Sequence, residues 1–148
     1  LEAHGVADFL IEIGGEVTAR GLAPSGSAWR IGIADPVAGG VHARITADGL
    51  VFATSGDAVN AYEVAGRRYS HTIDPATGEP VENGVASVTV GAADGAMADA
   101  LATAFLVMGP ARGLDLAGRL GLPVLYLMRG EAGVVARASP QFDALRLA

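Results

Sequence analysis

The chain has 148 residues, of which 51% are hydrophobic and 18% charged, with a formal net charge of −6 and no cysteine. These values suit one compact folded domain and exclude a disordered chain, disulfides and cysteine–zinc sites. Every basic residue is arginine and none are clustered in a stripe, so nucleic acid is not expected as a partner, and the missing lysine excludes Schiff-base and P-loop lysine chemistry.

Apolar, β-branched or alternating runs predict strands along most of the chain, at 6–13, 16–20, 29–33, 41–45, 50–54, 59–64, 67–73, 86–90, 124–129 and 134–139. The first strand is expected to be largely buried, with Gly14-Gly15 forming a bulge or a close backbone approach before the strand resumes. The Asp-Gly pair within 46–49 predicts a hairpin between the fourth and fifth runs. Further hairpins are expected around Ala65-Gly66 and around residues 130–133.

Helix-forming residues replace this pattern from residue 95 to residue 108, and Gly109-Pro110 predicts the stop. A second helix is expected from Pro110 to Leu120, with Gly121 after its end. Residues 1–5 read as the last turn of a helix, as in a fragment cut inside one. The order predicts an α+β domain over residues 1–148, in which two consecutive helices pack on one face of an antiparallel sheet.

The first predicted helix carries a candidate metal pair. Asp99 and Thr103 are four residues apart and therefore share one helix face, where they offer a carboxylate and a hydroxyl oxygen to a hard cation such as Mg²⁺. The alternative, favoured by this short pattern alone, is structural: Asp99 interacts with the helix dipole and Thr103 bonds to a backbone carbonyl. The run from 98 to 107 is otherwise apolar, and the charge of Asp99 within such a run would need a partner.

Polar side chains also crowd the segment YSHTIDPATGEP, residues 69–80. His71 within it is a candidate general base, or an ordinary hydrogen-bonded side chain beside a turn. Residues 54–57, Thr-Ser-Gly-Asp, can either offer backbone N–H groups to a phosphate or form a plain turn. From these residues alone a hydrolase, a transferase and a binding module all remain open.

Read together, five segments resemble the family of FAD:protein FMN transferases, formerly called thiamine-biosynthesis lipoproteins. The segments are FLIEIGGEV (9–17), WRIGIADP (29–36), ATSGD (53–57), RRYSHTIDPATGEPV (67–81) and AMADALATAFLVMG (96–109). The combination of SHTIDPATG with ADALAT is far more specific than either motif alone. The resemblance implies antiparallel sheets with helices, related to the T-fold, and the C-terminal portion of such an enzyme.

The resemblance further implies Mg²⁺-dependent transfer of FMN from FAD to a threonine hydroxyl of a target protein, with release of AMP. Alternatives are a metal-dependent FAD pyrophosphatase that gives FMN and AMP, and a flavin-binding module without turnover. The N-terminal half would supply the remaining FAD contacts and a carbonyl ligand for the metal, so the isolated chain is expected to have little activity. Family members are commonly exported or membrane-anchored, but no signal in this chain identifies a compartment.

The resemblance also assigns the site residues. Asp99 and Thr103 would supply oxygen ligands to Mg²⁺, and His71 would be the base for the acceptor threonine. The residues assigned to FAD are Ser55, Gly56, Ser70, His71, Thr72 and Ile73. One departure is Met97, which stands where the family usually has alanine and is expected to tighten packing beside the metal.

Overall fold

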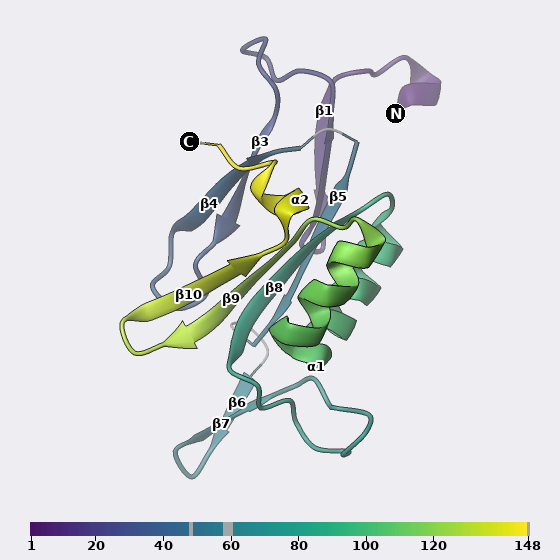
Figure 1. Cartoon of the computed structure of the whole chain (residues 1–148). Coiled ribbons are helices and arrows are strands. Elements are labelled where there is room, and N and C mark those ends of the chain that lie inside the picture. Colours follow the sequence, from purple (N-terminus) through teal and green to yellow (C-terminus); the bar gives the residue numbers. More distant parts are fainter. Residues whose placement is uncertain (48, 58–60, 148) are drawn as a thin grey trace.

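A computed structural model describes residues 1–47, 49–57 and 61–147. After a short 3₁₀ turn, η1 (Glu2–His4), the elements are β1 (Phe9–Ile13), β2 (Glu16–Arg20), β3 (Arg30–Ala34), β4 (Val41–Thr46), β5 (Val51–Gly56), β6 (Ala61–Val64), β7 (Arg67–Ser70), β8 (Val85–Ala92), α1 (Gly95–Leu120), β9 (Val124–Gly130), β10 (Gly133–Ala138) and α2 (Pro140–Asp143). Figure 1 shows their arrangement.

Six of these strands form one sheet in the order β1-β2-β5-β8-β9-β10, and every pair in it is antiparallel. The hairpins β3–β4 and β6–β7 each form a separate two-stranded sheet. The predicted α+β class with an antiparallel sheet is therefore confirmed.

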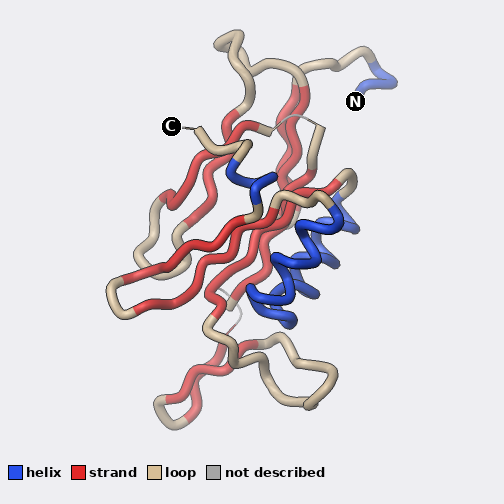
Figure 2. The backbone as a smooth tube through the Cα atoms, in the orientation of Figure 1, coloured by secondary structure: helices blue, strands red, loops and turns tan. Residues whose placement is uncertain are grey.

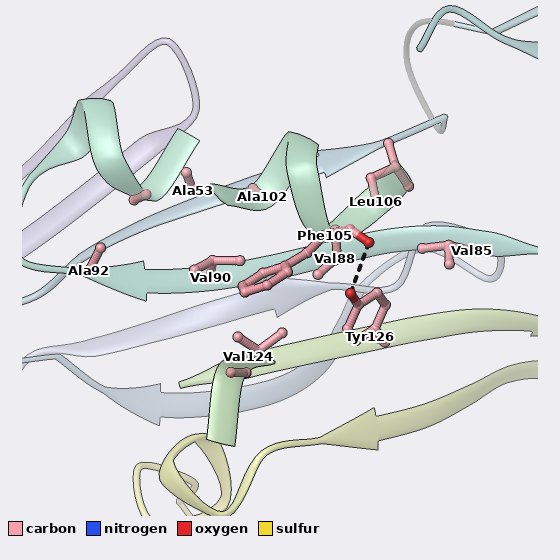
Figure 3. Packing of buried hydrophobic residues seen from close by; sticks show 12 residues of the cluster. Ala53, Val85, Val88, Val90, Ala92, Ala102, Phe105, Leu106, Val124 and Tyr126 are labelled. Carbon is pink, nitrogen blue, oxygen red and sulfur yellow. Dashed lines mark hydrogen bonds between the residues drawn. The ribbon is translucent and has the colours of Figure 1, made fainter. Parts of the chain in front are cut away.

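The six-stranded sheet is covered on both faces (Figures 1 and 2). On one face α1 packs over β5, β8 and β9, where Val88, Val90, Phe105 and Tyr126 are buried together (Figure 3). On the other face β3–β4 and α2 cover a second core that includes Ile45, Phe52 and Phe142. Because β8 is covered on both sides, all of its residues are buried, which explains its nearly continuous apolar sequence.

The chain from 95 to 120 forms one element, α1, in which Gly109 has non-helical backbone angles (φ 72°, ψ 169°). This break lies at the predicted Gly109-Pro110 stop. Pro110 has no N–H to donate to Leu106, and the Asn83 side chain donates to that carbonyl instead, at 2.7 Å. The Tyr126 hydroxyl donates to the carbonyls of Phe105 (2.8 Å) and Gly109 (3.2 Å). Side chains from outside the helix therefore satisfy the carbonyls that the break exposes.

By length and composition α1 is also apolar enough to cross a membrane. Its buried residues, which include Ala98, Ala102 and Phe105, pack against the sheet. A helix that packs one side against a sheet can have the same composition.

The prediction for the first strand was wrong in two respects. β1 is an edge strand and is largely exposed, with Ile13 at 72%. Gly14-Gly15 is not a bulge but a two-residue hairpin turn, since Ile13 pairs with Glu16 and both glycines have positive φ (67° and 106°). Two-residue turns of type I′ need φ > 0 at both central positions, which glycine adopts without strain.

The predicted hairpin between 41–45 and 50–54 was also wrong. β4 pairs with β3, whereas β5 lies between β2 and β8 in the larger sheet. The chain between β4 and β5 therefore passes from one layer to the other, and Asp48 of the expected turn lies outside the described residues.

The two other predicted hairpins are confirmed, with Val64 opposite Arg67 and Gly130 opposite Gly133. β7 ends at Ser70 and not at residue 73, and residues 59 and 60 of the predicted sixth strand lie outside the described part. The helix α2 had no counterpart among the predicted elements.

Candidate functional site

The first half of α1 presents Asp99 and Thr103 on its exposed surface, one turn apart. The Thr103 hydroxyl oxygen lies 3.0 Å from that of Ser55 on β5. The helix cap is Asp94, whose side chain accepts from the Met97 N–H at 2.9 Å. The cap of α1 is thus Asp94, and the Thr103 hydroxyl contacts a side chain on β5.

The Asp99 carboxylate has no hydrogen-bond or ion-pair partner among the described residues. It is exposed, so water solvates its charge and the apolar composition around it imposes no buried partner. An exposed carboxylate without a protein partner remains available to an exogenous ligand.

The donor chemistry of this pair fits a hard divalent cation as part of a ligand set. A carboxylate and a hydroxyl are both oxygen donors, but octahedral Mg²⁺ needs further ligands from water, substrate or other backbone. Within residues 1–47, 49–57 and 61–147, no group of three or more acidic, histidine or cysteine side chains is placed to hold a metal. Asp99 and Thr103 would therefore supply only a fraction of the coordination sphere.

Residues 54–57, for which a plain turn was the alternative, belong largely to β5. Ser55 pairs with Val88 and Gly56 with Ser87 of β8. A Cβ at Gly56 would lie 2.5 Å from the Ala86 carbonyl oxygen, so only glycine permits this close approach of the strands. The β2 pairing ends at Phe52, and in the described part of the chain no strand flanks the rest of β5 on that side. Thr54 is exposed there, and Ser55 and Gly56 are half-buried.

The segment after β7 alternates between buried and exposed side chains. Ser70 and Thr72 are both 8% exposed, and the Ser70 hydroxyl accepts from the Thr72 N–H at 3.1 Å. His71 and Ile73 are exposed, and Ile73 forms a bridge with Pro80. Ser70 and Thr72 therefore hold the segment, while the side chains of His71 and Ile73 are the ones that a ligand can reach.

The turn that follows is fixed by Asp74. Its carboxylate accepts from the Ala76 N–H at 2.8 Å, and its carbonyl accepts from the Gly78 N–H at 2.8 Å. A cavity of about 550 Å³ lies between this loop and α1; its lining is Tyr69, Asp74, Thr77, Glu79, Pro80, Val81, Glu82, Asn83 and Val107. The loop thus lies against the kinked end of the first half of α1 (Figure 1).

The structure brings only some of the predicted site residues together. Ser55 and Thr103 are in contact. In the part of the chain that the structure describes, no hydrogen bond joins His71 to Asp99 or Thr103. Among these residues the structure therefore shows no direct link between the metal pair and the candidate base.

Sequence reasoning missed the role of Asp57. Its carboxylate accepts from Arg68 Nε at 3.1 Å and from the Arg129 guanidinium, and it is 14% exposed. Its position in ATSGD, among the segments shared with the family, was the only available signal.

A second and larger cavity, of about 630 Å³, lies on the sheet face opposite α1. Three of the segments that carry the family resemblance meet there: Gly14 and Gly15 from the first, residues 31–36 from the second, and Thr54 and Gly56 from the third. The sequence analysis did not predict this convergence, because it paired β4 with β5 and gave β3 no partner.

Asp35 contributes a negative charge at the rim of this cavity. The backbone N–H groups of Ala38 and Val37, each 2.8 Å from its carboxylate, hold the pKa of Asp35 below its usual value, and His42 adds a smaller effect in the same direction. The carboxyl is therefore ionised at neutral pH.

Comparison with solved structures gives the class of protein. The flavinyl transferase ApbE of Pseudomonas stutzeri in its apo form superposes with a TM-score of 0.83 at 42% identity, over 97% of this chain and 45% of that one. The flavin transferase ApbE of Vibrio cholerae gives 0.85 at 38% identity, over 98% and 46%. The fold is that of flavin transferases.

A model of the ApbE family matches residues 1–126, and the chain belongs to this family. The FAD:protein FMN transferase of Vibrio cholerae is 41% identical over 144 residues, which are 96% of this chain and 43% of that protein. For the FAD:protein FMN transferase of Treponema pallidum the identity is 33% over 153 residues, with 93% and 42% covered. The resemblance noted in the sequence is confirmed, and the chain spans less than half the length of these relatives.

Proposed function

We propose that the protein containing this chain transfers FMN from FAD to a threonine hydroxyl of a target protein and releases AMP. The observation that carries the proposal is the identity of 33–41%, over nearly the whole chain, with relatives named FAD:protein FMN transferase. An acceptor flavoprotein is then its macromolecular partner and FAD its substrate.

The chemistry is a phosphoryl-type transfer. The acceptor threonine oxygen attacks the phosphorus on the FMN side of the FAD diphosphate, and the bond from that phosphorus to the bridging oxygen breaks. AMP leaves with the bridging oxygen, and the threonine proton passes to a base. Such a reaction depends on positioning and on charge neutralisation, and it needs no nucleophile from the enzyme.

In this proposal His71 is the base. Its side chain is exposed and lacks a protein partner among the described residues, so it can approach a hydroxyl from a second protein. The buried neighbours Ser70 and Thr72 fix the backbone on either side of it. Ile73 would cover part of the FAD, and the backbone at Ser55 and Gly56, which does not pair with β2, would face the phosphates.

Asp99 and Thr103 would hold Mg²⁺, whose charge would stabilise the diphosphate and the leaving AMP when bound. The contact of Thr103 with Ser55 orients the hydroxyl toward β5. The remaining ligands and FAD contacts would come from the part of the relatives that this chain does not span, as expected of one half of a T-fold-like enzyme. For that reason the 148 residues alone are expected to be nearly inactive.

The test uses the intact protein with FAD, Mg²⁺ and an acceptor, and compares Asp99→Ala with the wild type. We expect FMN incorporation to fall at least ~100-fold and FAD affinity to lose its dependence on Mg²⁺. Asp115→Ala is the matched control, because Asp115 is also an exposed carboxylate but lies on the second half of α1. An unchanged metal dependence in Asp99→Ala would remove the metal assignment. Free FMN formed without acceptor would identify a pyrophosphatase, and FAD binding without turnover a binding module.

A further inference from the structure

Asp57 joins two elements that are far apart in the chain. Its carboxylate binds Arg68 of β7, at 3.1 Å from Nε, and the guanidinium of Arg129 on β9. The Arg68 guanidinium also donates to the Asp57 backbone carbonyl. The carboxylate is 14% exposed, so water screens these ion pairs less than it screens ordinary surface pairs.

The hairpin β6–β7 forms its own two-stranded sheet and has no strand pairing with the large sheet. Other contacts, such as those of Asp57, must therefore hold it against the large sheet. In Figure 1 it extends beyond the end of β5. β7 ends at Ser70 and is followed directly by His71, so any movement of the hairpin moves the start of the segment that carries His71. The Arg68–Asp57 contacts anchor the hairpin at the end of β5.

The far end of the same segment is also attached to this group of residues. The Arg129 N–H donates to the Gly84 carbonyl at 2.9 Å, while its guanidinium reaches Asp57. A cavity of about 280 Å³ separates the two attachments; Asp57, Arg68 and Arg129 line it together with Ser70 and Asn83. Asp57 therefore connects the beginning and the end of residues 70–84 to one point at the end of β5.

We propose that Asp57 is a positioning residue that holds the His71-bearing segment, residues 70–84, in register with the large sheet through Arg68 and Arg129. This inference rests on the proposed function for its catalytic consequence. Its structural consequence, the tethering of the segment, does not depend on any activity.

Carboxylate–guanidinium pairs with several hydrogen bonds carry geometric specificity as well as energy. Loss of the carboxylate leaves two adjacent guanidinium groups without their common acceptor, and their repulsion pushes β7 and β9 apart. The hairpin then moves relative to Ser55 and Thr103, which belong to the sheet and to α1. A displacement of about 1 Å in a positioned group can lower a rate by about 100-fold.

The test compares Asp57→Asn with the wild type in the intact protein, by amide hydrogen exchange and by steady-state kinetics with FAD and the acceptor. We expect faster exchange confined to residues 68–84, kcat at least about tenfold lower and KM for FAD changed less than about threefold. Asp57→Glu, which keeps the charge, should restore part of kcat. Asp115→Asn is the matched control, since it also removes one aspartate–arginine pair (Asp115–Arg119, 3.4 Å) but on the exposed side of α1.

Arg68→Gln is the second variant, in case Asp57→Asn does not fold. Arg68 is 48% exposed, and Asp57 keeps Arg129 as its partner when Arg68 is replaced, so no buried charge is left unpaired. Arg68→Gln should loosen the same residues. Unchanged exchange across 68–84 in both variants, or faster exchange spread over the whole sheet, would overturn the positioning role. If the wild-type protein transfers no FMN, the proposed function is refuted. Hydrogen exchange still tests the positioning role of Asp57 in that case, because it does not depend on activity.

Discussion

The hydroxyl oxygens of Ser55 on β5 and Thr103 on α1 lie 3.0 Å apart, across 48 residues of sequence. This contact directs the Thr103 side chain toward β5. It connects two of the five segments that carry the family resemblance, ATSGD and the ADALAT segment.

Thr103→Val should abolish most metal-dependent transfer, because valine keeps the shape of threonine and removes the oxygen donor. We expect at least ~10-fold loss of FMN incorporation at saturating FAD, with a shift of half-saturation toward higher Mg²⁺. The measurement is a Mg²⁺ titration of transfer by the intact protein. Thr103→Ser keeps the hydroxyl and should stay near wild type. Ser55→Ala removes only the orienting partner, and an effect as large as that of Thr103→Val would argue that the hydroxyl pair, and not a metal, is what matters.

His71→Ala should retain FAD binding and lose transfer, because the exposed imidazole is assigned to the proton of the acceptor and not to holding the dinucleotide. General-base catalysis contributes about 10²–10⁴-fold, so kcat should fall within that range while FAD affinity changes little. FAD binding is measured by fluorescence quenching and transfer by covalent flavin on the acceptor. His4→Ala, an exposed histidine in η1, is the control. Transfer at the wild-type rate in His71→Ala would eliminate the base assignment.

Gly113→Ala should destabilise the fold, because the new Cβ would lie 1.9 Å from the Tyr126 hydroxyl oxygen and 2.9 Å from the ring. Overpacking of this kind typically costs about 1–3 kcal/mol. Gly118→Ala on the same helix meets nothing within 4 Å and should stabilise by about 0.5–1 kcal/mol. Urea unfolding of both variants gives the comparison, and equal midpoints would show that the helix does not approach β9 so closely.

Tyr126→Phe should cost about 1–3 kcal/mol, because the Phe105 and Gly109 carbonyls would lose their donor at the break in α1. Burial raises the pKa of Tyr126 above its ordinary value of 10.0. The folded state therefore keeps the phenol protonated where the unfolded state releases the proton, so stability falls as pH rises above 10. Thermal unfolding between pH 8 and pH 11 should show a steeper alkaline decline in wild type than in Tyr126→Phe. Parallel declines would mean that other groups cause the loss.

Much of the local structure was readable from the sequence, since turn chemistry depends on adjacent residues. Gly109-Pro110 marked the break in α1, and Ala65-Gly66 marked the turn of β6–β7. Gly14-Gly15 was misread because alternation continues on both sides of it, as it would across a bulge. The partners of β4 and β5 were misread because strand pairing is decided by distant neighbours and by the two faces of the sheet.

The sequence by itself determined the fold class, the family, and the residue types of the candidate site, because composition, turn residues and motif order are local properties of the chain. Only the tertiary structure decided which of those residues meet. Ser55 reaches Thr103, and Asp57 reaches Arg129 across 72 residues, only once α1 and β9 have packed beside β5 and β8. The buried or exposed state of Ser70, His71 and Thr72 was decided in the same way, by what the surrounding elements cover.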